Sequence, residues 1–391
     1  MRSLILLLSL VATQAAEHYD VVVVGATPAG VAAAYNAARE GATTVLVEET
    51  IHIGGLASGG LSNTDLRDFE SVGGTFQEFM RRVQSDYADR YGTDSQQVKD
   101  SVLGGYYEPG VARRVFERML AEQKVNVLKF HRLTAVGKQG SRLSSATFQD
   151  VRGGGNRTIS GGVFIDATYE GDLMARADVP YHLGCEAKAK YGESLAPDEE
   201  NKWVQTFNFR VCLTRDPANS MGLPKPKGYR AGDFAQLAQE LREGKVTSFA
   251  NPDPNPALKV RPIPNNKADF NDIPNAFSLA VENINHPWVE GDPAVRKDIF
   301  DQYKRHSLGL FYFLANDPQV PETIRRSMKQ WGIPKDEYRD SDNWTPALYV
   351  REGRRMIGDF VFTEHHTQPA AGSLRGPMQT DSVAVGFYSL N

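Results

Sequence analysis

The sequence predicts an α/β fold in which parallel strands carry a nucleotide-binding turn, and three observations near its start predict it. An apolar, β-branched run at 19–24 ends abruptly at a glycine turn, 25–30. An alanine-rich stretch at 31–40 has the composition of a helix. A second apolar run at 43–47 ends at an acid, Glu48. This order of strand, turn, helix and strand is typical of a βαβ unit.

The turn itself has the features of a pyrophosphate site, because backbone N–H groups at a helix N-terminus bind anions. It reads Gly25-Ala26-Thr27-Pro28-Ala29-Gly30, so Thr27 replaces the middle glycine of the pattern G-x-G-x-x-G. Glu48 follows 18 residues after Gly30, where an acid accepts hydrogen bonds from an adenosine ribose. We therefore predict a dinucleotide in a Rossmann-like domain. The plainer alternative is a βαβ unit with a tight turn.

A glycine-dense loop follows Glu48. Gly54, Gly55, Gly59 and Gly60 lie within seven residues. Backbone without side chains lets a long, flat cofactor lie against the protein. A flexible surface loop is the alternative.

The segment 165–172 predicts a second close approach of backbone to the cofactor. Ala167 and Thr168 are small residues at the end of a strand, and Gly171 and Asp172 begin a helix. Asp172 would interact favourably with the helix dipole, although plain helix capping explains it equally.

The rest of the chain predicts further elements. Short alternating segments between 125 and 166 predict a small antiparallel sheet appended to the parallel one. A strand is expected at 205–213, and 251–274, rich in Pro, Asn and Asp, predicts a long irregular loop or lid. Helical patterns lie at 75–89, 111–123, 294–315, 323–332 and 347–364.

Composition indicates a globular protein and excludes one class of partner. The 391 residues suffice for two domains or one large elaborated domain. Hydrophobic residues make up 41% and charged residues 24%, which is ordinary for a soluble protein. The net charge is −4 and no long Lys/Arg block occurs, so we expect no nucleic-acid partner.

The N-terminus predicts a signal peptide over 1–16 and hence a secreted protein. Residues 1–12 form a charged start and a short apolar core, and 13–16 offer small residues for a peptidase. The apolar run is shorter than the ~20 residues of a membrane span. No later segment is long and apolar enough to span either. Two N-x-[ST] sequons, at Asn156 and Asn343, fit an exported glycoprotein. An N-terminal strand or helix of the fold is the alternative to a leader.

Cysteine and histidine patterns predict no metal site. Cys185 and Cys212 are the two cysteines; one disulfide or two free thiols are equally consistent with them. Two cysteines cannot form a four-cysteine iron–sulfur or zinc site. His365 and His366 are adjacent, so they would diverge on a helix.

Together, 19–48, the glycine loop and 165–172 resemble the FAD-dependent oxidoreductase family of the glutathione-reductase type. More narrowly, the chain is similar to secreted flavoproteins described as "xanthan lyase-like", through 181–195, 313–318 and 348–356. The resemblance extends from Tyr19 to the C-terminus. It implies a three-layer FAD-binding fold over 17–180 and an inserted mixed or helical substrate domain over 181–391.

The resemblance also implies non-covalent FAD and assigns the residues around it. The first turn would line the pyrophosphate, Glu48 the ribose, the glycine loop the isoalloxazine, and the backbone of Leu133 the adenine. His52 lies near where some flavoproteins attach FAD covalently. The family usually continues with a segment that closes over the flavin, so we expect a chain shortened at its C-terminus. The implied cofactor-binding residues are Gly25, Thr27, Pro28, Ala29, Gly30, Glu48, Gly54, Gly55, Ser58, Gly59, Gly60, Leu133, Ala167, Thr168, Gly171 and Asp172.

No motif specifies catalytic residues, since a flavin carries the redox chemistry itself. Arg351, Arg354 and Arg355 would share one face if 347–364 is helical. Arg351 and Arg355 are therefore candidates to hold a substrate carboxylate. A solvated or salt-bridged face, neutralised by Glu352, is the alternative.

We therefore predict a secreted FAD-dependent oxidoreductase that transfers a hydride between flavin and an organic substrate, either a small molecule or a carbohydrate. One rival is an NAD(P)-dependent dehydrogenase, which the second Gly-Gly and Ala-Thr segments disfavour. The other is a secreted protein that lost the flavin and acts as a binding module or in polysaccharide processing.

Overall fold

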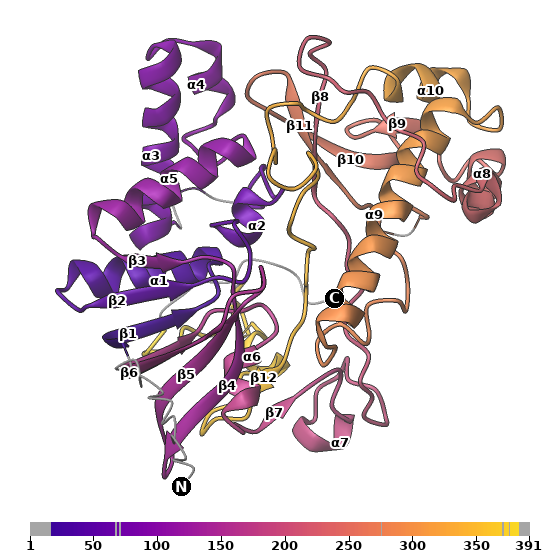
Figure 1. Cartoon of the computed structure of the whole chain (residues 1–391). Coiled ribbons are helices and arrows are strands. Elements are labelled where there is room, and N and C mark those ends of the chain that lie inside the picture. Colours follow the sequence, from indigo (N-terminus) through magenta and orange to yellow (C-terminus); the bar gives the residue numbers. More distant parts are fainter. Residues whose placement is uncertain are drawn as a thin grey trace, which may run out of the picture.

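A computed structural model of the chain describes residues 17–66, 69, 72–274, 276–369, 371–374 and 376–382. The predicted leader at 1–16 and almost all of the C-terminal run after Thr380 lie outside these residues. The described chain forms two units, each built on its own sheet (Figure 1). No helix of the described part is long and apolar enough to cross a membrane.

The first unit is a six-stranded sheet with the strand order β3-β2-β1-β6-β5-β4. The pairs β3–β2, β2–β1 and β1–β6 are parallel, whereas β6–β5 and β5–β4 are antiparallel. The predicted α/β class is confirmed, including the antiparallel strands appended to a parallel core. The strands are β1 (Glu17–Val24), β2 (Thr44–Val47), β3 (Asn126–Leu128), β4 (His131–Gln139), β5 (Arg142–Asp150) and β6 (Asn156–Asp166).

Alternate residues of the central strands feed two separate cores, because successive side chains of a strand point to opposite faces. Val23 and Leu46 pack with the helices on one face, and Val22 and Val45 pack with Phe148 on the other. The sheet is therefore packed on both faces, which gives the three layers that the resemblance implies. The helices are α1 (Pro28–Arg39), α3 (Gly74–Tyr91) and α5 (Pro109–Glu122) on the first face, with α6 (Asp172–Arg176) on the second; α2 (Gly55–Ser58) and α4 (Gln96–Asp100) are short.

The second unit is a four-stranded sheet with the order β8-β11-β10-β9, along which the long helix α9 lies (Figure 1). Aromatic residues dominate its core, among them Phe207, Phe209, Phe270 and Phe311, all fully buried. The elements are β8 (Val211–Thr214), β9 (Ser248–Ala250), β10 (Pro256–Ile263), β11 (Lys267–Asn271), η1 (Ala231–Phe234), α8 (Ala235–Arg242), α9 (Pro293–Asn316) and α10 (Glu322–Met328).

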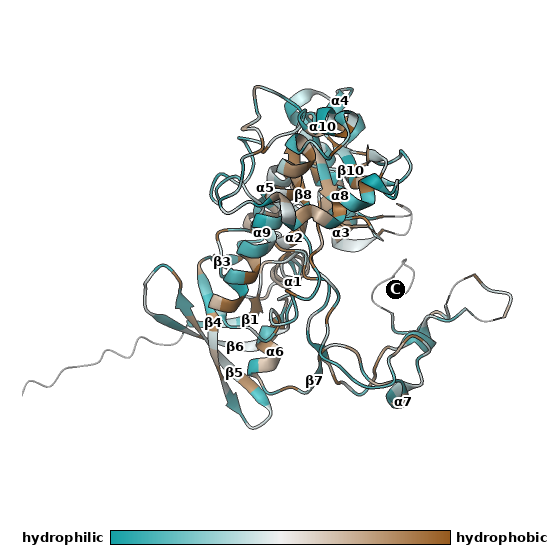
Figure 2. Ribbon diagram, turned by 90° about the vertical axis from the view of Figure 1, so that its right-hand side faces the viewer, coloured by the Kyte–Doolittle hydropathy of each residue, from teal (hydrophilic) through white to brown (hydrophobic). Residues whose placement is uncertain are grey.

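A smaller extension contains β7 (Tyr181–His182), paired with β12 (Arg355–Met356), and also α7 (Lys188–Tyr191) and η2 (Glu364–His366). Figure 2 shows this part standing apart from the two sheets, and it shows the hydrophilic ends of the β4–β5–β6 strands projecting on the other side. The two thiols are not paired: Cys185 is exposed and Cys212 is buried on β8.

The prediction of a long loop or lid at 251–274 is wrong. β10 and β11 form an antiparallel hairpin there, whose turn holds Asn265 and Asn266 at φ +63° and +56°. Asparagine tolerates this left-handed conformation better than most residues. The composition that suggested an irregular loop therefore belongs to the turns, while Leu258 and Phe270 between them are fully buried.

The predicted helix at 347–364 is also wrong, and other bounds differ. This segment contains an isolated bridge of Tyr349 with Asn208, the strand β12 and the start of η2, and no α-helix, so the three arginines share no helix face. Glycines at 353 and 358 oppose a helix, and the Arg354 N–H instead bonds the Glu170 carbonyl. Of the strand expected at 205–213, only 211–213 is regular, as part of β8, and α10 ends at Met328.

β11 joins the two units through two side chains on the same face, Lys267 and Asp269. The Asp269 carboxylate pairs with the buried guanidinium of Arg210 and accepts a hydrogen bond from the Asn63 N–H at 3.2 Å. Arg210 also pairs with Asp65 of the first unit at 3.0 Å. Because Arg210 and Asp269 are both withdrawn from water, removing either would leave an uncompensated buried charge.

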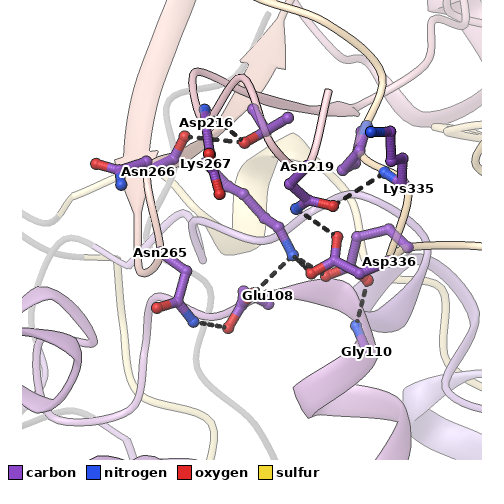
Figure 3. A network of polar contacts seen from close by, with 12 residues as sticks. Glu108, Gly110, Asp216, Asn219, Asn265, Asn266, Lys267, Lys335 and Asp336 are labelled. Atoms are coloured by element: carbon purple, nitrogen blue, oxygen red, sulfur yellow. Dashed lines mark hydrogen bonds and ion pairs between the residues drawn. The ribbon is translucent and has the colours of Figure 1, made fainter. Parts of the chain in front are cut away.

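Lys267 lies among three carboxylates (Figure 3). Its Nζ is 2.6 Å from Glu108, which caps α5 of the first unit, 2.8 Å from Asp336 and 2.7 Å from Glu337. Burial would lower the pKa of Lys267, but the carboxylates raise it. Burial raises the pKa of Glu337 to about 7; the charge of Lys267 opposes this rise, and the charges of Glu108 and Asp336 add to it. The ammonium thus occupies the space that these three acids could otherwise offer a metal ion.

We predict that Glu337 makes the protein less stable as the pH rises from about 4.5 to about 7. In this window folded Glu337 holds a proton that the unfolded residue has lost, so the free energy of unfolding falls with rising pH. Glu337→Gln should remove a slope on the order of 3 kcal/mol across the window, measured by urea unfolding at several pH values.

Asp336→Asn is the matched control. Burial alone would raise the pKa of Asp336, but its hydrogen bond to Lys267 holds it below the ordinary value. The contribution of Asp336 to the free energy of unfolding therefore changes only below pH 4.5. The fall in stability between pH 4.5 and 7 should persist in Asp336→Asn. A wild-type slope that survives in Glu337→Gln would contradict the assignment.

Candidate functional site

The strand register brings the predicted cofactor residues to one edge of the first sheet. Val24 at the end of β1 lies level with Val47 of β2 and with Asp166 of β6. Since parallel strands end at the same edge, the first turn, Glu48 and the segment after β6 meet there. We call this place the cradle: residues 25–30, 48, 54–55 and 167–169.

The first turn packs too tightly for side chains at its two outer glycines. Gly25 has φ +94°, and a Cβ on it would lie 2.9 Å from the backbone of Ala167. A Cβ on Gly30 would lie 1.9 Å from the carbonyl oxygen of Gly25. Both glycines are therefore required by the close approach of the turn to itself and to the end of β6.

Thr27, the departure from the glycine pattern, turns its side chain into the protein. Its hydroxyl donates to the Ala167 carbonyl at 2.8 Å and accepts from the Gly30 N–H at 3.2 Å. The residue is buried and caps α1. A threonine with this orientation leaves the outer side of the turn open.

The N-terminus of α1 keeps backbone donors for a ligand, among them the N–H of Ala29. Pro28 has no N–H, the Gly30 N–H bonds the Thr27 hydroxyl, and the Val31 N–H bonds the Thr27 carbonyl. Nothing among the described residues accepts from the N–H of Ala29, which is an exposed residue. This donor and the helix dipole favour an anion here.

Glu48 reaches back from the end of β2 to the first turn. One carboxylate oxygen accepts from the Ala26 N–H at 2.8 Å, and the other accepts from the Thr50 N–H at 3.0 Å and its hydroxyl at 2.9 Å. A carboxylate accepts about four hydrogen bonds, so one place stays free. Burial raises the pKa of Glu48 despite these bonds.

The two glycine pairs of the loop serve different neighbours. The Gly54 N–H donates to the Ala26 carbonyl at 2.8 Å, which fixes the loop beside the first turn. Gly59 and Gly60 instead face the second unit, where a Cβ would lie 2.5 Å from the Ala347 Cβ and 2.0 Å from the Arg210 oxygen, respectively. The structure thus places only the first pair in the cradle.

Tyr169 fills the space that Gly55 leaves. A Cβ on Gly55 would lie 2.5 Å from the Tyr169 hydroxyl and 3.0 Å from the Cα of Thr27. The hydroxyl accepts a hydrogen bond from the Leu56 N–H at 2.7 Å. Tyr169 was not among the predicted residues, although a large aromatic residue directly after Ala-Thr is visible in the sequence.

Ser58 and His52 lie inside the protein, beside the cradle. The fully buried Ser58 hydroxyl donates to the Ile53 carbonyl at 2.6 Å and lies 2.9 Å from Nε2 of His52. Burial lowers the pKa of His52 to about 4, so its ring is neutral. Its position in the core makes it a packing residue rather than a group presented to a ligand.

Thr168 organises the end of β6 through backbone contacts. Its hydroxyl donates to Asp166 at 2.7 Å and accepts from the N–H groups of Gly171 and Asp172 at 3.0 and 2.9 Å. Ala167, by contrast, is buried and lies against Gly30 of the first turn. The segment therefore supports the cradle from behind.

Asp172 is held by two arginines. Arg296 of α9 contacts both carboxylate oxygens, at 2.6 and 2.8 Å, and Arg354 adds a third bond at 2.9 Å. Burial would raise the pKa of Asp172, but these arginines hold it below its ordinary value. The observed role of Asp172 is to tie α6 to the second unit.

The candidate arginines occupy different surroundings. Arg351 donates to Asn208 at 2.6 Å and lies over the Tyr349 ring, and its other N–H groups have no acceptor among the described residues. Arg355 is engaged by Glu352, Glu186 and the Gly184 carbonyl. Arg351 alone of the pair keeps donors for a substrate.

The remaining predicted residue and the cavities lie elsewhere. Leu133 on β4 is buried in the core on the face opposite α1. Two cavities, of about 490 and 940 Å³, lie along α9 in the second unit, and the larger is lined by Phe234, Phe277 and His306. Neither is lined by a residue of the cradle.

Comparison with known proteins identifies the family. A family model described as FAD dependent oxidoreductase matches residues 20–391, nearly the whole chain. No curated protein matches the chain.

Solved structures share parts of the chain at low identity. Glycerol-3-phosphate dehydrogenase from Bacillus halodurans, complexed with FAD, is 15% identical over 41% of this chain and 37% of its own, with a TM-score of 0.29. L-proline dehydrogenase from P. horikoshii is 13% identical over 51% of this chain and 61% of its own, with a TM-score of 0.33. Bacillithiol disulfide reductase from Bacillus cereus is 14% identical over 45% of this chain and 45% of its own, with a TM-score of 0.28. The chain thus spans less than two thirds of each, and TM-scores this low add nothing to the family match.

The residues of the cradle fit FAD, the cofactor of this family. The free Ala29 N–H at the start of α1 suits a pyrophosphate, and Glu48 lies one hydrogen bond from the same turn, as a ribose ligand must. Thr27 does not block the turn, because its hydroxyl is directed at Ala167.

We predict that Glu48→Ala weakens FAD binding by about 1.5–3 kcal/mol, roughly one to two decades in Kd. The ribose would lose its charge-assisted hydrogen bond to the carboxylate. Titration by quenching of flavin fluorescence measures the affinity. Glu48→Gln, which keeps one acceptor oxygen, should lose less. Equal FAD affinity in Glu48→Ala and wild type would place the ribose elsewhere.

Proposed function

The chain belongs to the FAD dependent oxidoreductase family, and we propose that it oxidises an organic substrate by hydride transfer to bound FAD outside the cell. The observation that carries the proposal is the meeting of the first turn and Glu48 at one sheet edge, 2.8 Å apart between the Ala26 nitrogen and the carboxylate. A nicotinamide cofactor would use the same two features, but the family match favours FAD.

In this proposal the chain's own residues bind and orient, while FAD supplies the hydride acceptor. The Ala29 N–H and the α1 dipole hold the pyrophosphate, and Glu48 holds the ribose. Arg351 supplies the cation for a substrate carboxylate, since its unused N–H groups form the fork that such a group accepts in pairs.

Asp272 is the candidate proton acceptor near Arg351. Burial raises the pKa of Asp272, while the charge of Arg351 opposes that rise. The Asp272 carboxylate already accepts the Ala280 N–H at 3.0 Å, which fixes its position. A carboxylate with a raised pKa is better matched to proton transfer near neutral pH than an exposed one.

We predict that small organic acids bleach the visible flavin absorbance of the FAD-loaded protein when mixed without oxygen. Arg351→Ala should raise KM for the best acid about 10-fold or more, because it removes the binding cation. Arg355→Ala is the matched control and should change KM little, since its partners are protein groups.

Two results would oppose this assignment. Equal changes in KM for Arg351→Ala and Arg355→Ala would exclude a carboxylate clamp at Arg351. Bleaching by uncharged sugars and not by acids would favour a carbohydrate substrate and leave Arg351 a structural residue. A protein that cannot be loaded with FAD would contradict the redox function itself.

Secretion is the remaining part of the proposal, supported by the leader-like composition of 1–16. Glu17 begins β1 and pairs with Arg157 at 2.5 Å, so cleavage before Glu17 would keep the whole strand. Of the two sequons, Asn156 is exposed, whereas the Asn343 amide donates to the Glu337 carbonyl at 2.8 Å.

We predict that the protein secreted by eukaryotic cells begins at Glu17 and carries glycan at Asn156 rather than Asn343. The Asn343 amide is already engaged within the fold, whereas Asn156 faces solvent at the start of β6. N-terminal sequencing and mass spectrometry of glycopeptides test both. A secreted chain that still contains residues 1–10 would refute the leader.

A further inference from the structure

Tyr169 is the one large side chain that the cradle receives from the end of β6. It is partly buried, and its hydroxyl lies where Gly55 lacks a Cβ, next to Thr27 of the first turn. Plain packing does not require a hydroxyl at this point. The oxygen accepts the Leu56 N–H at 2.7 Å, which fixes both the phenol and the loop backbone.

The proton of this hydroxyl has no acceptor among the described residues. A phenol donates one hydrogen bond and can accept others, and here only the accepting role is used. Burial raises the pKa of Tyr169 above its ordinary value, so the proton stays on the oxygen at physiological pH. A fixed, neutral donor therefore remains inside the cradle, in addition to the free N–H of Ala29.

We propose that the Tyr169 hydroxyl is a ligand of the cofactor's pyrophosphate, donating to a phosphate oxygen beside the first turn. The inference rests on the proposed use of FAD. It supplies, from the end of β6, an anion contact at a turn in which Thr27 stands for the usual glycine. The Leu56 N–H strengthens this donor, because hydrogen bonds in a chain polarise one another.

The geometry also permits an opposite role, in which the phenol occupies the cradle and must leave before a cofactor enters. The two roles differ in sign. Removing a ligand weakens binding, whereas removing an obstruction strengthens it. The unused proton favours the ligand, since an obstruction gains nothing from a donor directed at no acceptor.

Tyr169→Phe tests the inference, because it keeps the ring and removes the hydroxyl alone. We expect Kd for FAD to rise about 10-fold or more, as for the loss of a hydrogen bond to a charged group. ADP, which carries a pyrophosphate without a flavin, should lose affinity by a similar factor when it competes with FAD. Affinities come from flavin fluorescence and calorimetry.

Tyr303→Phe is the control for a general effect on folding. It removes a buried hydroxyl that donates to the Val281 carbonyl at 2.9 Å in the second unit. Its FAD and ADP affinities should stay within about 2-fold of wild type. Equal losses in Tyr303→Phe and Tyr169→Phe would overturn the inference, as would unchanged or tighter binding by Tyr169→Phe.

The two ligands separate this inference from the proposed function. Loss of FAD affinity with unchanged ADP affinity would overturn the pyrophosphate contact and place the hydroxyl at the flavin. A wild-type protein that binds ADP and not FAD would contradict the FAD function, while the ADP titrations of Tyr169→Phe would still decide the role of the hydroxyl. Wild-type protein that binds neither ligand would overturn both.

Discussion

The parallel register of β1 between β2 and β6 determines where every residue of the cradle lies. Val24 is level with Val47 and Asp166, so three chain segments leave the sheet at one edge. Gly25 and Gly30 permit this convergence, since a side chain on either would collide with backbone. The Thr27 hydroxyl then joins the first turn to the end of β6 at 2.8 Å. The cradle is thus a product of strand alignment before it is a set of ligands.

The second unit is held to this edge by buried charge rather than by apolar contact alone. Lys267 and Asp269 lie on the same face of β11, and they contact Glu108 and Asn63 of the first unit. Asp172 provides a third tie through Arg296. Buried ion pairs of this kind fix the orientation of the second unit, because a shifted interface would leave desolvated charges without partners.

Much of the first unit could be predicted from the sequence, because local signals and tertiary structure agree there. The β-branched run, the glycines and Glu48 each have one structural use at a strand end. The second unit resisted prediction where composition and burial diverge: the hairpin at 256–271 hides Leu258 and Phe270 between polar turns. At 347–364 the helical pattern was overridden by long-range pairing, including the Arg354 N–H with Glu170.

Site residues were predictable as a group and less so one by one. Glycine spacing located the cradle, but it could not tell Gly54, which faces the first turn, from Gly60, which faces Arg210. The resemblance to the family assigned Asp172 to the cofactor, but its arginine partners lie more than a hundred residues away in the sequence. Such distant ion pairs leave no periodic trace in a sequence.

The position of Lys267 and Asp269 on one face of β11 has a consequence for how the two units can move apart. The two ion networks share one short strand, β11, so separating that strand from the first unit breaks both of them. Parting the two units would therefore release all these charges in one step, as a single cooperative subglobal unit. Separation of the two units would accordingly be rare and complete rather than gradual.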